Sequence, residues 1–159
     1  MHVRVPMRAI PVDLRLRSGA KLHVTLHLAE AVQDHEGGET MMDFLEADRH
    51  FLPVHDDDGK LLLLNRDGIV YLRIARDATP VLSMSASSSA DGLRAVDVVN
   101  VSLPFTDDDA ALVGVLANEL PPDETRVSDI VNGPEQFLAI EDDRGTVYLQ
   151  KHLVVSLSF

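Results

Sequence analysis

The chain has 159 residues, of which 45% are apolar and only 4% aromatic, and its formal net charge is −12. This length and composition can supply a buried core for one domain or two small ones, packed mainly by aliphatic side chains. The apolar runs are too short for a membrane-spanning helix, and the absence of cysteine excludes disulfides and thiolate metal sites. Because the N-terminal residues do not resemble a signal peptide, we expect a cytoplasmic protein.

The negative charge is concentrated in the second half of the chain. Residues 1–78 carry a net charge of −3 and residues 79–159 a net charge of −9. An acidic surface repels phosphate, so the second half is expected to bind nucleic acid poorly. Basic residues gather instead near the N-terminus, where Arg15 and Arg17 lie on one predicted strand and could form a local basic patch.

The first half of the chain predicts five strands and one short helix. Residues 10–17 and 22–28 alternate between apolar and polar side chains, with Ser18 and Gly19 at the turn, which indicates a β-hairpin. Thr40 followed by Asp43 has the pattern of a capping box and predicts a helix of about two turns. Short strands separated by turns rich in Asp and Gly are then expected at 51–54, 60–65 and 69–74.

The second half predicts a similar order of elements. A Ser-rich segment at 79–93 is interpreted as a linker between a first unit, 1–78, and a second unit, 94–159. Alternation from Val99 onward, followed by an Asp-rich turn and an apolar run, predicts another hairpin. A short helix is expected at 125–131, and strands are expected at 136–141, 146–150 and 153–158.

The second unit repeats part of the first about 86 positions later. Three segments of the first unit correspond to three of the second: Asp43-Phe44-Leu45 to Asp129-Ile130-Val131, Phe51-Leu52-Pro53-Val54 to Phe137-Leu138-Ala139-Ile140, and Asp56-Asp57-Asp58-Gly59 to Asp142-Asp143-Arg144-Gly145. A shared register of this length indicates one structural unit present twice. We therefore expect a mainly β protein made of two tandem five-stranded units, each barrel-like and each with one short helix, because closure removes exposed strand edges.

The segment from Leu62 to Leu72 resembles the second conserved motif of Sm-like proteins. In that motif two short strands flank an Arg-Gly-type turn, as Arg66-Asp67-Gly68 is flanked here, and the next strand reads Ile/Val-x-Tyr-Ile. The resemblance implies a small barrel and, as one alternative, nucleic-acid binding through Arg15, Arg17 and Arg66. The chain departs from the Sm-like pattern by placing its helix after the second strand.

Strand alternation also predicts which side chains of the last two strands of each unit face the core. The predicted core positions are Leu61, Leu63, Ile69 and Tyr71 in the first unit, and Val147, Leu149, Val155 and Leu157 in the second. On the opposite face the first unit carries Leu62, Leu64, Val70 and Leu72, where the second carries Tyr148, Gln150, Ser156 and Ser158. Because exposed apolar patches usually mark contact sites, we predict that this face of the first unit is an interface, either within the chain or with another molecule.

No set of residues predicts a catalytic, cofactor or metal site. His23 and His27 lie on a predicted strand, where four residues span about 13 Å, too far apart to bind one metal ion. The Asp clusters at 56–58, 107–109 and 142–143 coincide with expected hairpin turns. The sequence therefore favours a non-enzymatic protein-interaction or assembly module that binds a protein partner or itself, with a nucleic-acid-binding protein and a small-ligand or metal-dependent enzyme as alternatives.

Overall fold

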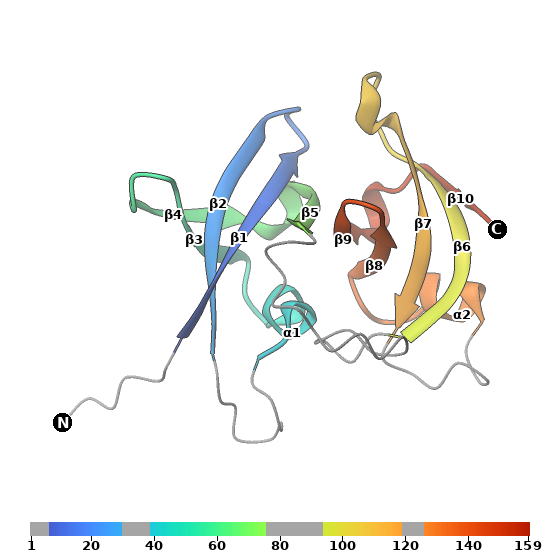
Figure 1. Cartoon of the computed structure of the whole chain (residues 1–159), viewed down its shortest axis with the longest axis horizontal. Coiled ribbons are helices and arrows are strands. Elements are labelled where there is room, and N and C mark those ends of the chain that lie inside the picture. Colours follow the sequence, from blue (N-terminus) through green and yellow to red (C-terminus); the bar gives the residue numbers. More distant parts are fainter. Residues whose placement is uncertain (1–6, 30–38, 76–93, 119–125) are drawn as a thin grey trace.

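The structure, a computed structural model, describes residues 7–29, 39–75, 94–118 and 126–159, and its ten strands form one antiparallel sheet (Figure 1). The N-terminal half contains β1 (Met7–Leu16), β2 (Lys21–Ala29), α1 (Met41–Glu46), β3 (Phe51–His55), β4 (Leu61–Asn65), the 3-10 turn η1 (Arg66–Gly68) and β5 (Ile69–Ala75). The C-terminal half contains β6 (Arg94–Ser102), η2 (Asp108–Ala110), β7 (Ala111–Asn118), α2 (Val127–Val131), β8 (Phe137–Asp142), β9 (Gly145–Gln150), η3 (Lys151–Leu153) and β10 (Ser156–Ser158). The expected linker at 79–93 lies outside the described residues.

The strand order is β10-β6-β7-β8-β9-β5-β1-β2-β3-β4. Within each half the strands therefore run in the same order, namely fifth, first, second, third and fourth, and the halves join where β9 pairs with β5. This arrangement corrects the expectation of two barrel-like units, because β4 and β5 would have to pair to close the first half, and β5 pairs with β9 instead. The sheet is open, and β4 and β10 are its two edges.

The short helices form where the sequence predicts them. Thr40 Oγ1 accepts a hydrogen bond from the Asp43 amide (3.1 Å), and the Asp43 carboxylate accepts one from the Thr40 amide (3.0 Å), so the expected capping box is present. Met41, Phe44 and Leu45 of α1 are buried against the sheet. α2 occupies the corresponding place in the second half, and its Val127 and Ile130 are buried.

Two apolar clusters form the cores of the two halves. The first combines residues of β1, β2, α1, β3 and β5 with four side chains from the C-terminal half, Ala117, Phe137, Ala139 and Tyr148. The second combines residues of β6, β7, α2, β8 and β9 with Val70 from the N-terminal half. Each half therefore contributes apolar side chains to the core of the other.

The prediction that Val155 faces the core is wrong, because this side chain is 65% exposed. The prediction that Leu61 and Leu63 face the core is also wrong. They are 54% and 62% exposed, whereas Leu62 and Leu64 pack against the first cluster. The reason is the length of the turn: the pair His55–Leu61 encloses one more residue than the corresponding pair Glu141–Thr146. A shift of one residue moves every later side chain of the strand to the opposite face.

Candidate interaction surface

The central feature of the molecule is the junction between β5 and β9. These strands pair antiparallel, with Leu72 opposite Tyr148 and Arg73 opposite Val147. Because successive side chains of a strand point to opposite faces, Tyr148 enters the first core while Val147 enters the second. The junction is thus a pairing of strand edges reinforced by apolar side chains on both faces.

Phe137 and Tyr148 are the largest side chains that the C-terminal half inserts into the N-terminal core. They are 1% and 0% exposed, and they lie in the first cluster together with Leu72 and Ile74 of β5. Buried aromatic side chains remove more apolar surface from water than most residues do, so they dominate the energy of such contacts. The Glu46 carboxylate at the end of α1 adds a polar contact, since it accepts hydrogen bonds from the amides of Gln136 (2.8 and 3.0 Å) and Phe137 (2.9 Å).

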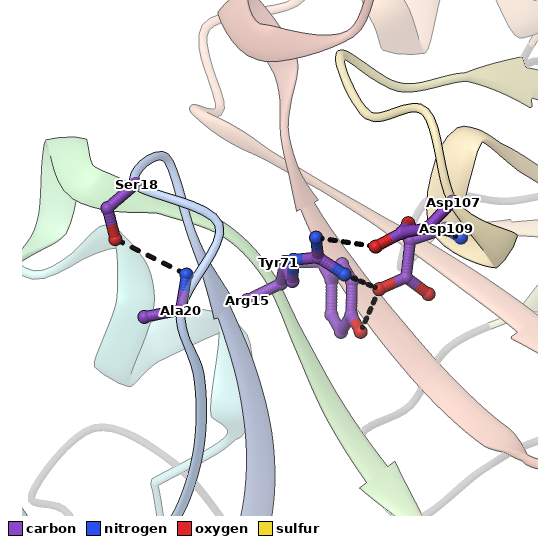
Figure 2. Close-up of polar contacts among 6 residues, drawn as sticks. All are labelled: Arg15, Ser18, Ala20, Tyr71, Asp107 and Asp109. Carbon is purple, nitrogen blue, oxygen red and sulfur yellow. Dashed lines mark hydrogen bonds and ion pairs between the residues drawn. The ribbon is translucent and has the colours of Figure 1, made fainter.

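A polar cluster closes one side of this junction (Figure 2). The guanidinium of Arg15 on β1 donates to Asp109 Oδ2 at 2.6 Å and to Asp107 Oδ2 at 2.8 Å, both in the turn between β6 and β7. Tyr71 donates its hydroxyl proton to the same Asp109 oxygen at 3.0 Å, and the guanidinium lies 4.1 Å from the centre of the Phe105 ring. The side chain of Arg15 is almost fully covered, so this cluster is an internal contact between the two halves.

The cluster shifts the ionisation of its members. The hydrogen bond from Arg15 and the one from the Asp109 amide hold the pKa of Asp107 below its usual value. Burial and the hydrogen bond to Asp109 raise the pKa of Tyr71 to about 12. At neutral pH Tyr71 is therefore a neutral phenol, and the Arg15 cation is shared between the carboxylates of Asp107 and Asp109. These contacts stabilise the packing of β1 and β5 against the β6–β7 turn.

Arg73 and Asp142 form a second ion pair across the junction. The guanidinium donates to both carboxylate oxygens at 2.8 and 3.0 Å, and the two side chains are largely buried. Burial raises the pKa of Asp142, but the hydrogen bonds from Arg73 and the Arg144 amide outweigh it, so the net pKa is lowered. Gln150, fully buried at the end of β9, donates to the carbonyls of Arg66 (2.9 Å) and Ile69 (2.7 Å) and so ties β9 to the turn before β5.

The two edges of the sheet carry apolar side chains that the described part of the chain leaves exposed. On the β3–β4 hairpin these are Phe51, Leu61 and Leu63, which we call the β3–β4 face. At the opposite edge Val155 is 65% exposed just before β10, and Phe159 is 73% exposed just after it. Among the described strands β4 pairs only with β3 and β10 only with β6, so both edges present backbone groups for another strand.

The apolar face predicted from the sequence, Leu62, Leu64, Val70 and Leu72, is divided between the two cores. Val70 is buried in the second cluster and Leu72 in the first, while Leu62 and Leu64 are half-buried against the first. In the structure these side chains therefore make contacts within the chain. The surface that is exposed, the β3–β4 face, was missed because it depends on the longer turn before β4.

The three arginines considered for nucleic-acid binding differ in exposure. Arg15 is held by the two aspartates described above, and Arg66 is buried with its Nη1 donating to the carbonyls of Leu45 (3.2 Å) and Ala47 (2.6 Å). Arg17 is exposed at the β1–β2 turn. Two of the three cations are therefore used inside the structure, and they do not form a common basic surface with the third.

The other polar clusters stabilise turns and strands. Asp56 Oδ1 accepts from the amides of Asp58 (3.0 Å) and Lys60 (2.9 Å), and Asp142 Oδ1 accepts from that of Arg144 (2.9 Å), which confirms their predicted place in turns. His23 lies 2.8 Å from Asp13, whose hydrogen bond raises the pKa of the imidazole. Within the described residues no group of three potential ligands could hold a metal ion.

Comparison of the chain with protein-family models, with curated proteins and with solved structures gave no match. The likeness to Sm-like proteins therefore remains an expectation from the sequence. None of the helices in the described residues is long and apolar enough to cross a membrane.

Proposed function

We propose that this chain is a non-enzymatic assembly module, made of a duplicated five-stranded unit, that binds protein through the edges of its sheet. The observation that carries the proposal is the difference between two equivalent hairpins. In the C-terminal half Phe137 and Tyr148 of β8–β9 are buried by the neighbouring half, whereas Phe51 and Leu63 of β3–β4 are 52% and 62% exposed.

The order of strands and the polar contacts support the duplication. Arg66 follows β4 and donates to the carbonyls that end α1, and Lys151 follows β9 and donates to the carbonyls of Ile130 (2.7 Å) and Gly133 (3.2 Å) at the end of α2. The amide of Arg66 also donates to His50, as the amide of Lys151 donates to Gln136, both at 2.8 Å. Within the described residues, the equivalent hairpin is thus buried in one half and exposed in the other.

Edge pairing is also the kind of contact by which the two halves join. A strand edge with exposed apolar residues favours the addition of another strand, in which backbone hydrogen bonds supply affinity and alternate side chains supply specificity. The described residues instead use their charged groups, notably Arg15, Arg73 and Asp142, for contacts inside the chain. This combination supports assembly over chemistry as the role of the fold.

The test is site-specific photo-crosslinking in the cells that express the protein. A photoreactive phenylalanine analogue at Phe51 is expected to give a covalent adduct with protein, because the β3–β4 face is in contact with a partner. The matched control is the same analogue at Val113, an exposed β7 residue away from both edges. Equal adducts from both positions, or none from Phe51, would refute the proposal.

A further inference from the structure

We infer that the partner at the β3–β4 face is a second copy of this chain, whose β10 pairs antiparallel with β4. The inference rests on the proposed function and specifies its partner. It follows from the junction already present in the molecule, in which the fourth strand of one half (β9) pairs with the fifth strand of the other (β5). Among the described strands, the two edges without a second neighbour are the fourth strand of the first half and the fifth strand of the second.

The equivalence of positions gives the register of the new pairing. Arg66 and Lys151 match through their contacts with the preceding helix, so β4 corresponds to β9, and β5 to β10, with a shift of 85 positions. Leu157 corresponds to Leu72, and Leu63 corresponds to Tyr148. Because Leu72 pairs with Tyr148 inside the chain, Leu157 of one copy is expected to pair with Leu63 of the other. In the same way Ile74–Thr146 becomes Phe159 opposite Leu61.

The side chains at these positions have the chemistry that the register requires. Tyr148 is fully buried beside Leu72, and its counterpart Leu63 is an exposed leucine that would lie beside Leu157. The remaining exposed apolar residues of both edges, Phe51 and Leu61 on one and Val155 and Phe159 on the other, lie on the surfaces that the pairing would cover. No charged side chain stands in the paired segments 61–64 and 156–159.

The receiving surface of the second half also resembles that of the first. Leu157 packs against the second cluster beside β6, as Leu72 packs in the first cluster beside β1. Asn132, at the end of α2, occupies the position of Glu46, whose carboxylate accepts the amides of the inserted strand. An amide oxygen at that place can accept the same kind of hydrogen bond.

Within the described residues β4 and β10 do not pair with each other, because they lie on opposite sides of the molecule (Figure 1). The contact is therefore between molecules and joins two different surfaces, so it is heterologous and propagates head to tail. A symmetric dimer in which β4 pairs with β4 would leave both β10 edges uncovered and would not reproduce the internal junction.

Disulfide trapping tests the register, since the chain contains no cysteine of its own. The first mixture contains the 159-residue chain with Leu63→Cys and the same chain with Leu157→Cys. The second mixture contains Leu62→Cys and Ser158→Cys, and both mixtures are oxidised. Adjacent pairs of an antiparallel ladder alternate between Cα separations of about 4.5 and about 5.5 Å, both within disulfide range, so the two mixtures cover both geometries. We expect a dimer of the mixed type in at least one mixture.

Three controls define the result. Leu63→Cys alone is expected to give little dimer, because a heterologous contact does not bring two β4 strands together. Leu63→Cys mixed with Val113→Cys reports random collision. Light scattering of the unmodified chain is expected to show a mass at least twice 17.4 kDa, reduced to that of the single chain by Leu63→Lys.

The outcomes separate this inference from the proposed function. A mixed dimer above the collision control, with an oligomer lost in Leu63→Lys, supports head-to-tail pairing. A symmetric Leu63–Leu63 dimer, or a monomer with no specific disulfide, overturns it. In the latter case photo-crosslinking at Phe51 still decides the proposed function, because an adduct with a different protein would support a module whose partner is not its own chain.

Discussion

Arg66 and Lys151 play the same structural part in the two halves of the sheet. Each follows the fourth strand of its half and donates hydrogen bonds to the carbonyls at the end of the preceding short helix: Arg66 Nη1 to Ala47 at 2.6 Å, and Lys151 Nζ to Ile130 at 2.7 Å. A helix of five or six residues leaves most of its terminal carbonyls without partners in the helix, so a cation placed there stabilises it strongly. Burial lowers the pKa of Lys151.

The first prediction concerns this helix-end contact. Arg66→Met removes a charged donor from the buried carbonyl of Leu45 and the partly buried carbonyl of Ala47. A hydrogen bond that involves a charged group contributes about 1.5–3 kcal/mol to stability. We expect a loss of about that size in the free energy of unfolding, measured in urea. Arg17→Met, at an exposed turn, is the control and should change stability by less than about 0.5 kcal/mol. Equal effects would contradict the assignment.

The second prediction compares equivalent positions at the two junctions. Tyr148→Ala removes a side chain that is fully buried in the N-terminal core, which typically costs about 3–5 kcal/mol for a large aromatic residue. Leu63→Ala, at the corresponding exposed position, should cost less than about 0.5 kcal/mol at concentrations low enough to keep the chain monomeric. Thermal and urea unfolding would measure both. A large loss for Leu63→Ala in the monomer would show that β4 is covered within the chain.

The third prediction follows from the Arg73–Asp142 pair. The pKa of Asp142 is lower in the folded protein than in the unfolded chain, so the unfolded state binds the proton more readily. The contribution to stability is therefore complete above the unfolded pKa of about 3.9 and is lost as the pH falls through the folded pKa. Asp142→Asn should be less stable at neutral pH and should lose less stability between about pH 5 and pH 3. The free energy of unfolding is measured at several pH values for both proteins. If it falls by the same amount between about pH 5 and pH 3 in both, the pair does not have this role.

The fourth prediction concerns the phenol in the polar cluster between the halves. Burial and the hydrogen bond to Asp109 raise the pKa of Tyr71 to about 12, above an unfolded value of about 10. Its contribution is thus complete below about pH 10 and is lost as the pH rises toward 12. Tyr71→Phe should show a smaller fall in stability over this alkaline range, measured by denaturant unfolding at successive pH values. Asp109→Asn should lower the pKa of Tyr71, which ultraviolet titration of tyrosinate would detect.

The fifth prediction is that the isolated protein does not bind RNA or DNA at physiological salt. The net charge of −12 opposes the release of counterions that drives such binding, and Arg15 and Arg66 are engaged within the chain. A filter-binding titration should therefore show no sub-micromolar affinity. Binding that Arg17→Glu weakens would reverse this expectation, because Arg17 is the exposed member of the three arginines.

Much of the local structure could be predicted because it depends on neighbouring residues. The alternation in β1 and β2, the capping box of Thr40 and Asp43, and the Asp-rich turns are determined by contacts within a few positions. The repeated order of strand, strand, helix, strand, strand and strand could be predicted for the same reason. The resulting fold class, mainly β with two short helices, agrees with the structure.

The faces of β4 could not be predicted, because one additional residue in the preceding turn reverses them. An ungapped comparison of the two halves paired Leu61 with Val147, whereas the register of the hairpins pairs Leu62 with Val147. A displacement of one residue assigns every side chain of β4 to the wrong face, since side chains alternate along a strand with a period of two. The candidate surface on Phe51 and Leu63 therefore became visible only in the folded chain.

The sequence by itself determined where strands, turns and short helices form, and that the same order of elements occurs twice. Only the tertiary structure decided that β5 pairs with β9 rather than closing on β4, so that the two halves make one open sheet. The physical reason is that edge pairing depends on the whole surface that two strands bring together. The junction brings together residues that are far apart in the sequence, namely Leu72, Phe137, Tyr148 and the Arg73–Asp142 pair. Their joint burial favours a pairing of β5 with β9 that no local sequence pattern encodes.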